Sequence, residues 1–174
     1  MLEVLSEWWN FALVFVQQNA HLTAPVVFAL GLAEGIALVS LFVPSSVLFL
    51  GLGGIYSAAG GEFWPVWLAG AAGAVVGDCL SYGLGRYFKH DVRRVWPISR
   101  YPGLIPQGQV LLERWGVLSV IAGKFIGALR PFVPVVAGML SMPVSLFLAA
   151  SVVSSLLWAG VFLAPGFGIT FLMN

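Results

Sequence analysis

Charged side chains are scarce in this sequence. Of its 174 residues, 8 are lysine or arginine and 7 are aspartate or glutamate, so only 9% are charged. Hydrophobic residues make up 60%, and the mean hydropathy is +0.98. Soluble domains carry about 25% charged residues, and here too few polar side chains remain to cover a water-exposed surface. We therefore expect an all-α, polytopic membrane protein that forms a single domain over residues 1–174.

Cysteine and histidine are nearly absent. Cys79 has no second cysteine to pair with, which excludes an intrachain disulfide and a cysteine metal cluster. His21 and His90 lie far apart in different polar stretches, which argues against a histidine metal site or catalytic dyad. We expect no metal, no cofactor and no enzymatic activity.

The N-terminus lacks the basic residues that precede the apolar run of a signal peptide. Glu3 and Glu7 stand there instead, followed by an aromatic-rich stretch. This pattern predicts a helix over residues 1–21 that lies in the membrane interface and is not removed.

Two apolar segments are too long for one simple span, which needs about 20 residues. The first covers residues 22–58; it predicts a helix from about Ala24, a break near Pro44 and a short returning half-helix. The second covers residues 108–142, with breaks at Gly127, Pro131 and Pro134. We expect both to be re-entrant hairpins, because broken backbone at membrane depth persists only where protein or a watery cavity covers it.

Residues 63–87 and 143–165 read as ordinary transmembrane helices, the second closed by Pro165 and Gly166. Within the first, small residues recur every four positions and share one helix face, which lets another helix approach closely. These residues are Ala69, Gly73, Gly77, Ser81 and Gly85. The Gly83-Leu84-Gly85 run is not a phosphate loop, since no strand precedes it and no Lys-Ser/Thr follows.

Basic residues concentrate between positions 86 and 114, around the loop 88–107. Six lysines and arginines face two acids there, which predicts a cytoplasmic location for this stretch. Because a membrane surface already accounts for these charges, we expect no nucleic-acid partner.

The two long segments carry one duplicated pattern. Ala33–Pro44 lies over Gly123–Pro134 at a constant offset, so that Phe-Val-Pro falls on Phe-Val-Pro and Glu34 falls on Lys124. Duplicated, proline-broken apolar segments are typical of transporters built as inverted repeats. We therefore expect the hairpins to pack face to face in opposite orientations.

The ionisable residues within these segments are the candidate site. Glu34 is expected to approach Lys124 or Arg130 near the midplane, where charges are costly and are kept for a reason. One interpretation is a purely structural ion pair. The functional one is that Lys124, Arg130, Ser45 and Ser46 bind an anionic group such as a phosphate, while Glu34 exchanges a proton.

Asp78, Tyr82 and Arg86 follow one another at four-residue spacing and share a helix face. Arg86 can reach the cytoplasmic interface, whereas Asp78 lies about two turns deeper. Asp78 is expected either to pair with Lys124 or Arg130 or to belong to a proton path, and Tyr82 and Arg86 to have secondary, structural roles.

These stretches resemble the DedA family of bacterial membrane proteins, also described as SNARE-associated or VTT-domain proteins. The resemblance rests on Glu34 with the run from Phe42 to Ser46, on the block Gly77–Arg86, and on Gly123–Pro134 continuing to Met139. It implies two re-entrant hairpins in an inverted repeat, in a bacterial inner membrane. It also implies a flippase or scramblase for a lipid phosphate, such as undecaprenyl phosphate or a glycerophospholipid, coupled to the proton-motive force.

The resemblance also assigns individual positions. Glu34 matches the first membrane acid of the family and Arg130 its second arginine, while Lys124 stands where arginine is usual. Ser46 occupies the place of a second acid, and Gly127 replaces a frequent proline. Some relatives carry a lipid phosphatase domain after this region. A natural protein that extends past Asn174 with such a domain is therefore compatible with the resemblance.

Other functions compete with lipid transport. A cation/proton antiporter or small-ion transporter would use the same intramembrane charges. A membrane lipid phosphatase is less favoured, since it needs a histidine nucleophile for which neither His21 nor His90 has the context. Expected partners are membrane lipids, the anionic lipid-phosphate substrate and protons; a homo-oligomer is left open.

Overall fold

The computed structural model describes residue 14 and residues 18–36, 45–89, 103–126, 129–130 and 132–173. Across these ranges the chain forms helices and no strand, which confirms the all-α prediction. The helices are, in order, α2 (Ala20–Gly35), α3 (Ser45–Ala58), α4 (Phe63–Phe88), α5 (Leu104–Trp115), α6 (Leu118–Gly123), α7 (Phe132–Met139) and α8 (Val144–Met173). The predicted interfacial helix 1–21 lies almost wholly outside the described residues.

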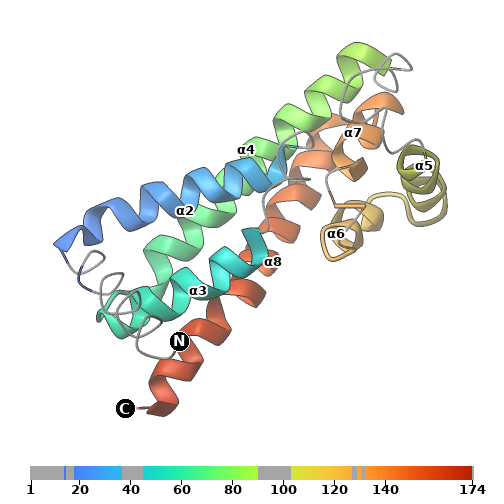
Figure 1. Ribbon diagram of the computed structural model, residues 1–174. Helices are drawn as coiled ribbons and strands as arrows, with labels where there is room; N and C mark the ends of the chain where they lie inside the picture. The colour runs from blue at the N-terminus through green and yellow to red at the C-terminus, as the bar shows by residue number, and fades with distance from the viewer. Residues whose placement is uncertain are drawn as a thin grey trace.

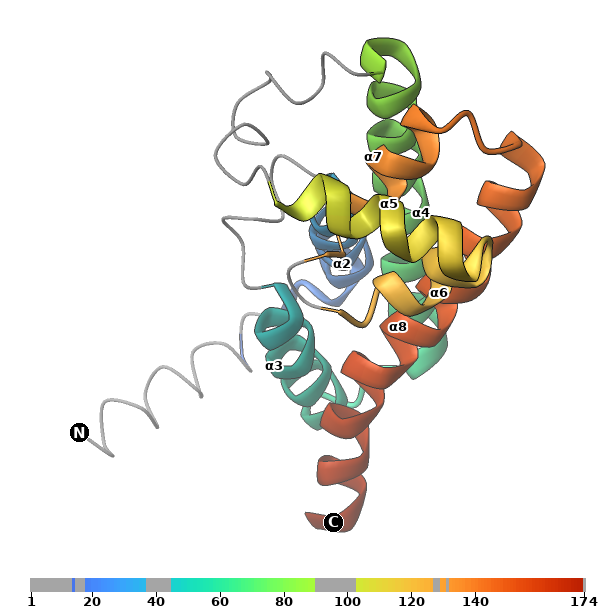
Figure 2. The same cartoon turned by 90° about the vertical axis from the view of Figure 1, so that its right-hand side faces the viewer.

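Helices α4 and α8 form the long axis of the molecule and run in opposite directions (Figures 1 and 2). Both are long and apolar enough to cross a membrane, α4 over Phe63–Phe88 and α8 over Val144–Gly168. Large apolar side chains stay exposed on their outer faces, for example Leu68 and Leu80 on α4 and Val161 on α8. Lipid is the surrounding that such faces require.

The predicted end of the last helix at Pro165 is wrong. Helix α8 continues through Pro165 to Met173. A proline removes one backbone donor, which a packed membrane helix can tolerate. Packing supports this part of α8, because a Cβ added at Gly166 would lie 2.5 Å from the Gly54 backbone nitrogen of α3.

Helix α2 ends earlier than the predicted break near Pro44. It stops at Gly35, and Ile36 is extended with φ −81° and ψ 114°. Ser81 Oγ of α4 donates a hydrogen bond of 2.8 Å to the Gly35 carbonyl, which satisfies an acceptor that the end of the helix leaves free. Pro44 itself lies outside the described residues.

Helices α2 and α3 run in opposite directions beside the long pair (Figure 1). Gly31 and Gly35 meet successively later residues of α4, so α2 is parallel to α4. Phe49 and Gly53 likewise meet Trp158 and Leu163, so α3 is parallel to α8. Both helices therefore reach the middle level of the α4–α8 pair from the same end. The chain has the outline of a hairpin here; its re-entry into a membrane stays a prediction.

Glycines form the contact between α2 and α4. A Cβ at Gly73 would collide with the Phe28 carbonyl oxygen, and one at Gly77 would lie 2.5 Å from the Leu32 carbonyl oxygen. Gly85, farther along the same face, meets the backbone of Val135 in α7. The small-residue stripe is thus confirmed as a surface for close helix packing.

The second long segment, 108–142, is divided into three short helices. The chain turns at Gly116, which has φ +54°, between α5 and α6. The predicted break at Pro134 is wrong: Pro134 is the third residue of α7, within the first turn, where a missing backbone N–H costs nothing. Gly127 and Pro131 lie outside the described residues. All eight residues of α7 are buried, so α7 is an internal element, and the inverted repeat stays a prediction.

Candidate polar site between the long helices

The polar site lies at the middle level of α4 and α8. Asp78 is ten residues before the end of α4, about 15 Å along the axis at 1.5 Å per residue. Ser155 is eleven residues after the start of α8, about 17 Å from the same end. Since a bilayer core is about 30 Å thick, helices that span it would place this site near the midplane.

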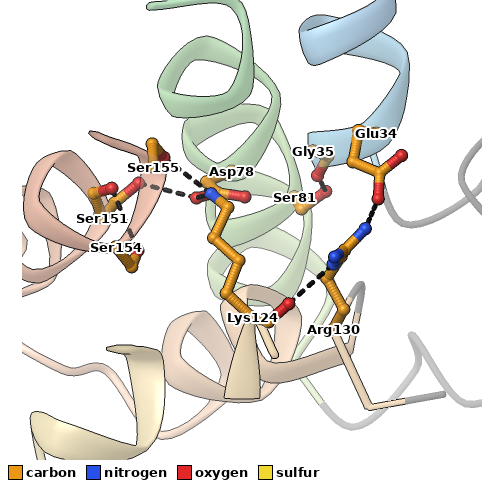
Figure 3. A network of polar contacts seen from close by, with 9 residues as sticks. All are labelled: Glu34, Gly35, Asp78, Ser81, Lys124, Arg130, Ser151, Ser154 and Ser155. Carbon is orange, nitrogen blue, oxygen red and sulfur yellow. Dashed lines mark hydrogen bonds and ion pairs between the residues drawn. The ribbon is translucent and has the colours of Figure 1, made fainter. Parts of the chain in front are cut away.

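Lys124 follows directly after α6 and reaches between the two long helices (Figure 3). Its Nζ donates hydrogen bonds of 2.5 Å to Asp78 Oδ2 and 2.6 Å to Ser155 Oγ. Ser151 Oγ donates a 2.7 Å bond to the same Asp78 oxygen. Lys124 and Asp78 are both buried, so the pair depends on these contacts to replace water.

Arg130 pairs with the other acid. Its Nη1 forms an ion pair with Glu34 Oε1 at the end of α2. Its Nε donates a 2.7 Å hydrogen bond to the backbone carbonyl of Lys124. The guanidinium also lies over two rings of α8, with Cζ 4.9 Å from the Trp158 centroid and 5.7 Å from the Phe162 centroid.

Each of the two ion pairs joins one acid to one base, and a hydrogen bond from Arg130 to the Lys124 carbonyl links the pairs. The Glu34 and Arg130 side chains are 4% and 11% exposed, and the Asp78 and Lys124 side chains 7% and 4%. Removing one member of such a buried pair costs about 3–5 kcal/mol, because an uncompensated charge is left behind. Each charge is therefore stable here only with its partner or with a substitute of the same sign.

The predicted site residues are partly brought together. Glu34 meets Arg130, and Asp78 meets Lys124, two of the pairings that the sequence left open. Lys124 and Arg130 touch through the Lys124 carbonyl, while their cationic groups bind different carboxylates. Ser45 and Ser46 form the first turn of α3, and the structure describes their backbone alone.

Tyr82 and Arg86 link the site to one end of the molecule. Tyr82 Oη donates a 2.5 Å hydrogen bond to the Met142 carbonyl and accepts a 2.8 Å bond from Arg86 Nη1. The Tyr82 ring stacks on Phe147 with centroids 4.4 Å apart. These contacts fasten the start of α8 to α4; the secondary role of Tyr82 and Arg86 stays a prediction.

The contribution of α8 is missing from the sequence-based site. That helix reads as an ordinary span, yet Ser151 and Ser155 hold the Asp78–Lys124 pair, and Trp158 and Phe162 flank Arg130. The available signal is their spacing of four, three and four residues, which places all of them on one helix face. Serines are common in apolar helices, so the spacing indicates a site only once the partner charges are located.

The described residues hold no group of three or more His, Cys, Asp or Glu side chains that could bind a metal ion. The donor set that they do offer consists of ammonium, guanidinium, hydroxyl and carboxylate groups. Such a set suits an exchange of anions or protons.

The sequence is similar to a known protein family and to individual bacterial membrane proteins. The family model described as VTT domain matches residues 43–168. Inner membrane protein YabI of Escherichia coli (strain K12) is 34% identical over 152 residues, covering 87% of this chain and 60% of YabI. Uncharacterized membrane protein Rv2637 of Mycobacterium tuberculosis (strain ATCC 25618 / H37Rv) is 35% identical over 141 residues, 78% of this chain and 65% of Rv2637.

A more distant relative is inner membrane protein YghB of Escherichia coli (strain K12), 27% identical over 146 residues, which cover 83% of this chain and 67% of YghB. The chain spans about 60% of the length of YabI. No solved structure matches it. The VTT-domain match, which covers most of the chain, shows that the chain belongs to the VTT-domain, or DedA, family of membrane proteins.

Proposed function

We propose that the chain is a membrane transporter that moves a lipid phosphate across a bacterial inner membrane, driven by the proton-motive force. Undecaprenyl phosphate and glycerophospholipids are the substrates that we put forward. One observation carries the proposal. The chain belongs to a membrane-protein family, and its largely buried Arg130, between the short helices α6 and α7, contacts the Glu34 carboxylate and a backbone carbonyl.

In this mechanism the Glu34 carboxylate occupies the place that the substrate phosphate takes. Arginine presents a planar fork of donors that fits carboxylate and phosphate oxygens equally well. An anion can reach Arg130 only when Glu34 withdraws, because two anions in one buried site repel each other. Protonation of Glu34 removes the competing charge and leaves Arg130 for the phosphate.

Release follows the reverse order. When Glu34 loses its proton on the other side of the membrane, the carboxylate pairs again with Arg130 and displaces the phosphate. Proton movement and phosphate movement are then coupled through one residue. Lys124, fixed by Asp78 and Ser155, holds the Arg130 side chain in place through its carbonyl.

The hydrocarbon tail of the substrate needs no binding pocket of its own in this scheme. Exposed apolar side chains line the outer faces of α4 and α8, including Val76, Leu80, Val152 and Val153. A polyprenyl or acyl chain can remain in the lipid beside such faces while the headgroup enters the protein.

The test is headgroup movement in proteoliposomes made with a fluorescent polyprenyl phosphate. Arg130→Ala is expected to reduce the rate at least 100-fold, since the ligand to the phosphate is gone. Arg114→Ala is the matched control, because Arg114 is exposed on α5, and it is expected to transport at the wild-type rate. Normal transport by folded Arg130→Ala protein would leave the Glu34–Arg130 pair as a purely structural contact.

A small-cation/proton antiporter is a second candidate, favoured by the Asp78–Lys124 pair. Asp78 and Ser155 present two oxygens to the Lys124 ammonium, and Ser151 donates a hydrogen bond to the same Asp78 oxygen. A cation such as Na⁺ could take the place of the ammonium among these oxygens if Lys124 lost its proton.

The two candidates differ in the transported species. Proteoliposomes loaded with a pH-sensitive dye and given a Na⁺ gradient would acidify or alkalise if the chain exchanged Na⁺ for protons. We expect no such response, and a response that Lys124→Ala abolishes and Arg130→Ala leaves intact would favour the antiporter.

A further inference from the structure

Trp158 is a buried tryptophan with an unused hydrogen-bond donor. It is fully buried in α8, packed against Phe49 with ring centroids 4.7 Å apart. Among the described residues its indole Nε1 has no hydrogen-bond partner. A buried donor left without a partner costs about 1–3 kcal/mol, so its retention calls for a compensating role.

The position of this donor is informative. The Arg130 guanidinium lies over the Trp158 ring. Beside the same arginine, Glu34 Oε2 is also buried and without a partner in the described part of the chain. One unused donor and one unused acceptor therefore flank the guanidinium on which the proposed function depends.

Another indole between α4 and α8, half-buried rather than fully buried, does have a hydrogen-bond partner. Trp67 Nε1 of α4 donates a 2.9 Å hydrogen bond to the Leu156 carbonyl of α8, two residues before Trp158. The same helix thus supplies a carbonyl to one tryptophan and carries another whose N–H is unused. A purely packing role would favour phenylalanine at position 158, which has no donor to bury.

We propose that Trp158 is a headgroup-binding residue whose indole N–H donates to an anionic oxygen of the ligand bound at Arg130. This inference rests on the proposed function and adds a second donor to its site. The ligand is an oxyanion with at least two acceptor oxygens, one for the guanidinium and one for the indole. In the absence of ligand, the Trp158 and Phe162 rings hold the guanidinium by cation–π contact.

The experiment measures binding and stability separately, on the purified chain in detergent. Farnesyl phosphate serves as a short polyprenyl phosphate, inorganic phosphate as the free anion, and farnesol as the uncharged control. Trp158→Phe keeps an aromatic ring under Arg130 and removes the N–H. We expect it to raise the Kd for farnesyl phosphate about tenfold, while the melting temperature of the unliganded protein stays unchanged or rises.

Trp67→Phe is the matched control, because it removes an indole N–H that already has a protein partner. It is expected to lower the melting temperature and to leave the Kd unchanged. An unchanged Kd in Trp158→Phe would overturn the inference, as would a loss of affinity no larger than that of Trp67→Phe.

The ligand arms separate the sources of the anion. If the chain binds farnesyl phosphate but not inorganic phosphate, the Trp158 N–H serves a lipid headgroup. If it binds both and Trp158→Phe weakens both equally, the N–H serves free phosphate as well. If Arg130→Ala abolishes transport and Trp158→Phe binds normally, this inference fails and the proposed function stands. Absence of binding of both phosphates to the wild-type chain overturns the two together.

Discussion

The two long apolar segments share a sequence pattern and have different shapes. In the first, residues 22–58, α2 and α3 are two helices of 16 and 14 residues, running in opposite directions. In the second, residues 108–142, the chain bends at Gly116 and forms α5, α6 and the short buried α7. The duplicated sequence pattern therefore identifies which residues supply the charged side chains of the site. The backbone conformation of each segment depends instead on its local packing.

The two segments supply side chains of opposite charge to the site. The first segment offers one acid, Glu34, at the end of a helix held by glycine contacts to α4. The second offers two bases, Lys124 and Arg130, on the turns between short helices. The following variants are ordered from the largest expected effect to the smallest, and each tests one side of this comparison.

Gly73→Val is expected to break the first segment away from α4. A side chain there would collide with the Phe28 carbonyl of α2, and backbone cannot move aside cheaply. Overpacking typically costs about 1–3 kcal/mol and occasionally more. Because the obstacle here is backbone, we expect the upper end of that range and the loss of most of the protein from the membrane fraction. The measurement is the amount of monodisperse protein after detergent extraction.

Gly83→Ala is the matched control on the same helix. Gly83 is exposed, and a Cβ there meets nothing within 4 Å. Alanine is the better helix former by about 1 kcal/mol, so this variant should match or exceed the wild-type yield. Equal losses in both variants would contradict the glycine contact as the cause.

Asp78→Asn tests the anchoring of the second segment. It leaves the Lys124 ammonium buried without its counter-charge, which is expected to lower the free energy of unfolding by about 3–5 kcal/mol. The double variant Asp78→Leu/Lys124→Leu removes both charges and should recover most of that loss. Urea or SDS titration of the purified protein gives these energies. A double variant no more stable than Asp78→Asn would contradict the pairing of the two charges.

Tyr82→Phe tests the fastening of α4 to the start of α8. It removes the hydrogen bonds to the Met142 carbonyl and from Arg86, while the stacking on Phe147 is kept. We expect a loss of about 1 kcal/mol in stability and little change in transport. A loss of transport at full stability would instead place Tyr82 within the substrate path.

Composition and periodicity predict the all-helical class and the membrane span of α4, because these two features depend on local sequence. The small-residue stripe at Gly73, Gly77 and Gly85 was likewise readable from four-residue spacing. The ends of α2 and α8 could not be predicted from the sequence. The end of α2 at Gly35 depends on a hydroxyl of Ser81, 46 residues away, and the continuation of α8 past Pro165 depends on packing against α3.

The candidate charges were recognisable from the cost of placing them in apolar segments. Their pairing was not, because Glu34 can reach either base until the turn after α6 is known. The part played by Ser151, Ser155 and Trp158 was hidden for a related reason. Each is an ordinary residue of an apolar helix until Lys124 and Arg130 come to lie beside it.

The central claim is that Glu34 and the substrate phosphate compete for Arg130, and binding of farnesyl phosphate to Glu34→Gln tests it most directly. Glutamine removes the competing charge and keeps the shape. Competition predicts that Glu34→Gln binds farnesyl phosphate more tightly than wild type does. It also predicts that wild-type binding becomes tighter as the pH falls and Glu34 is protonated, and that the variant lacks this pH dependence. Weaker binding by folded Glu34→Gln protein, with the pH dependence intact, would contradict the account.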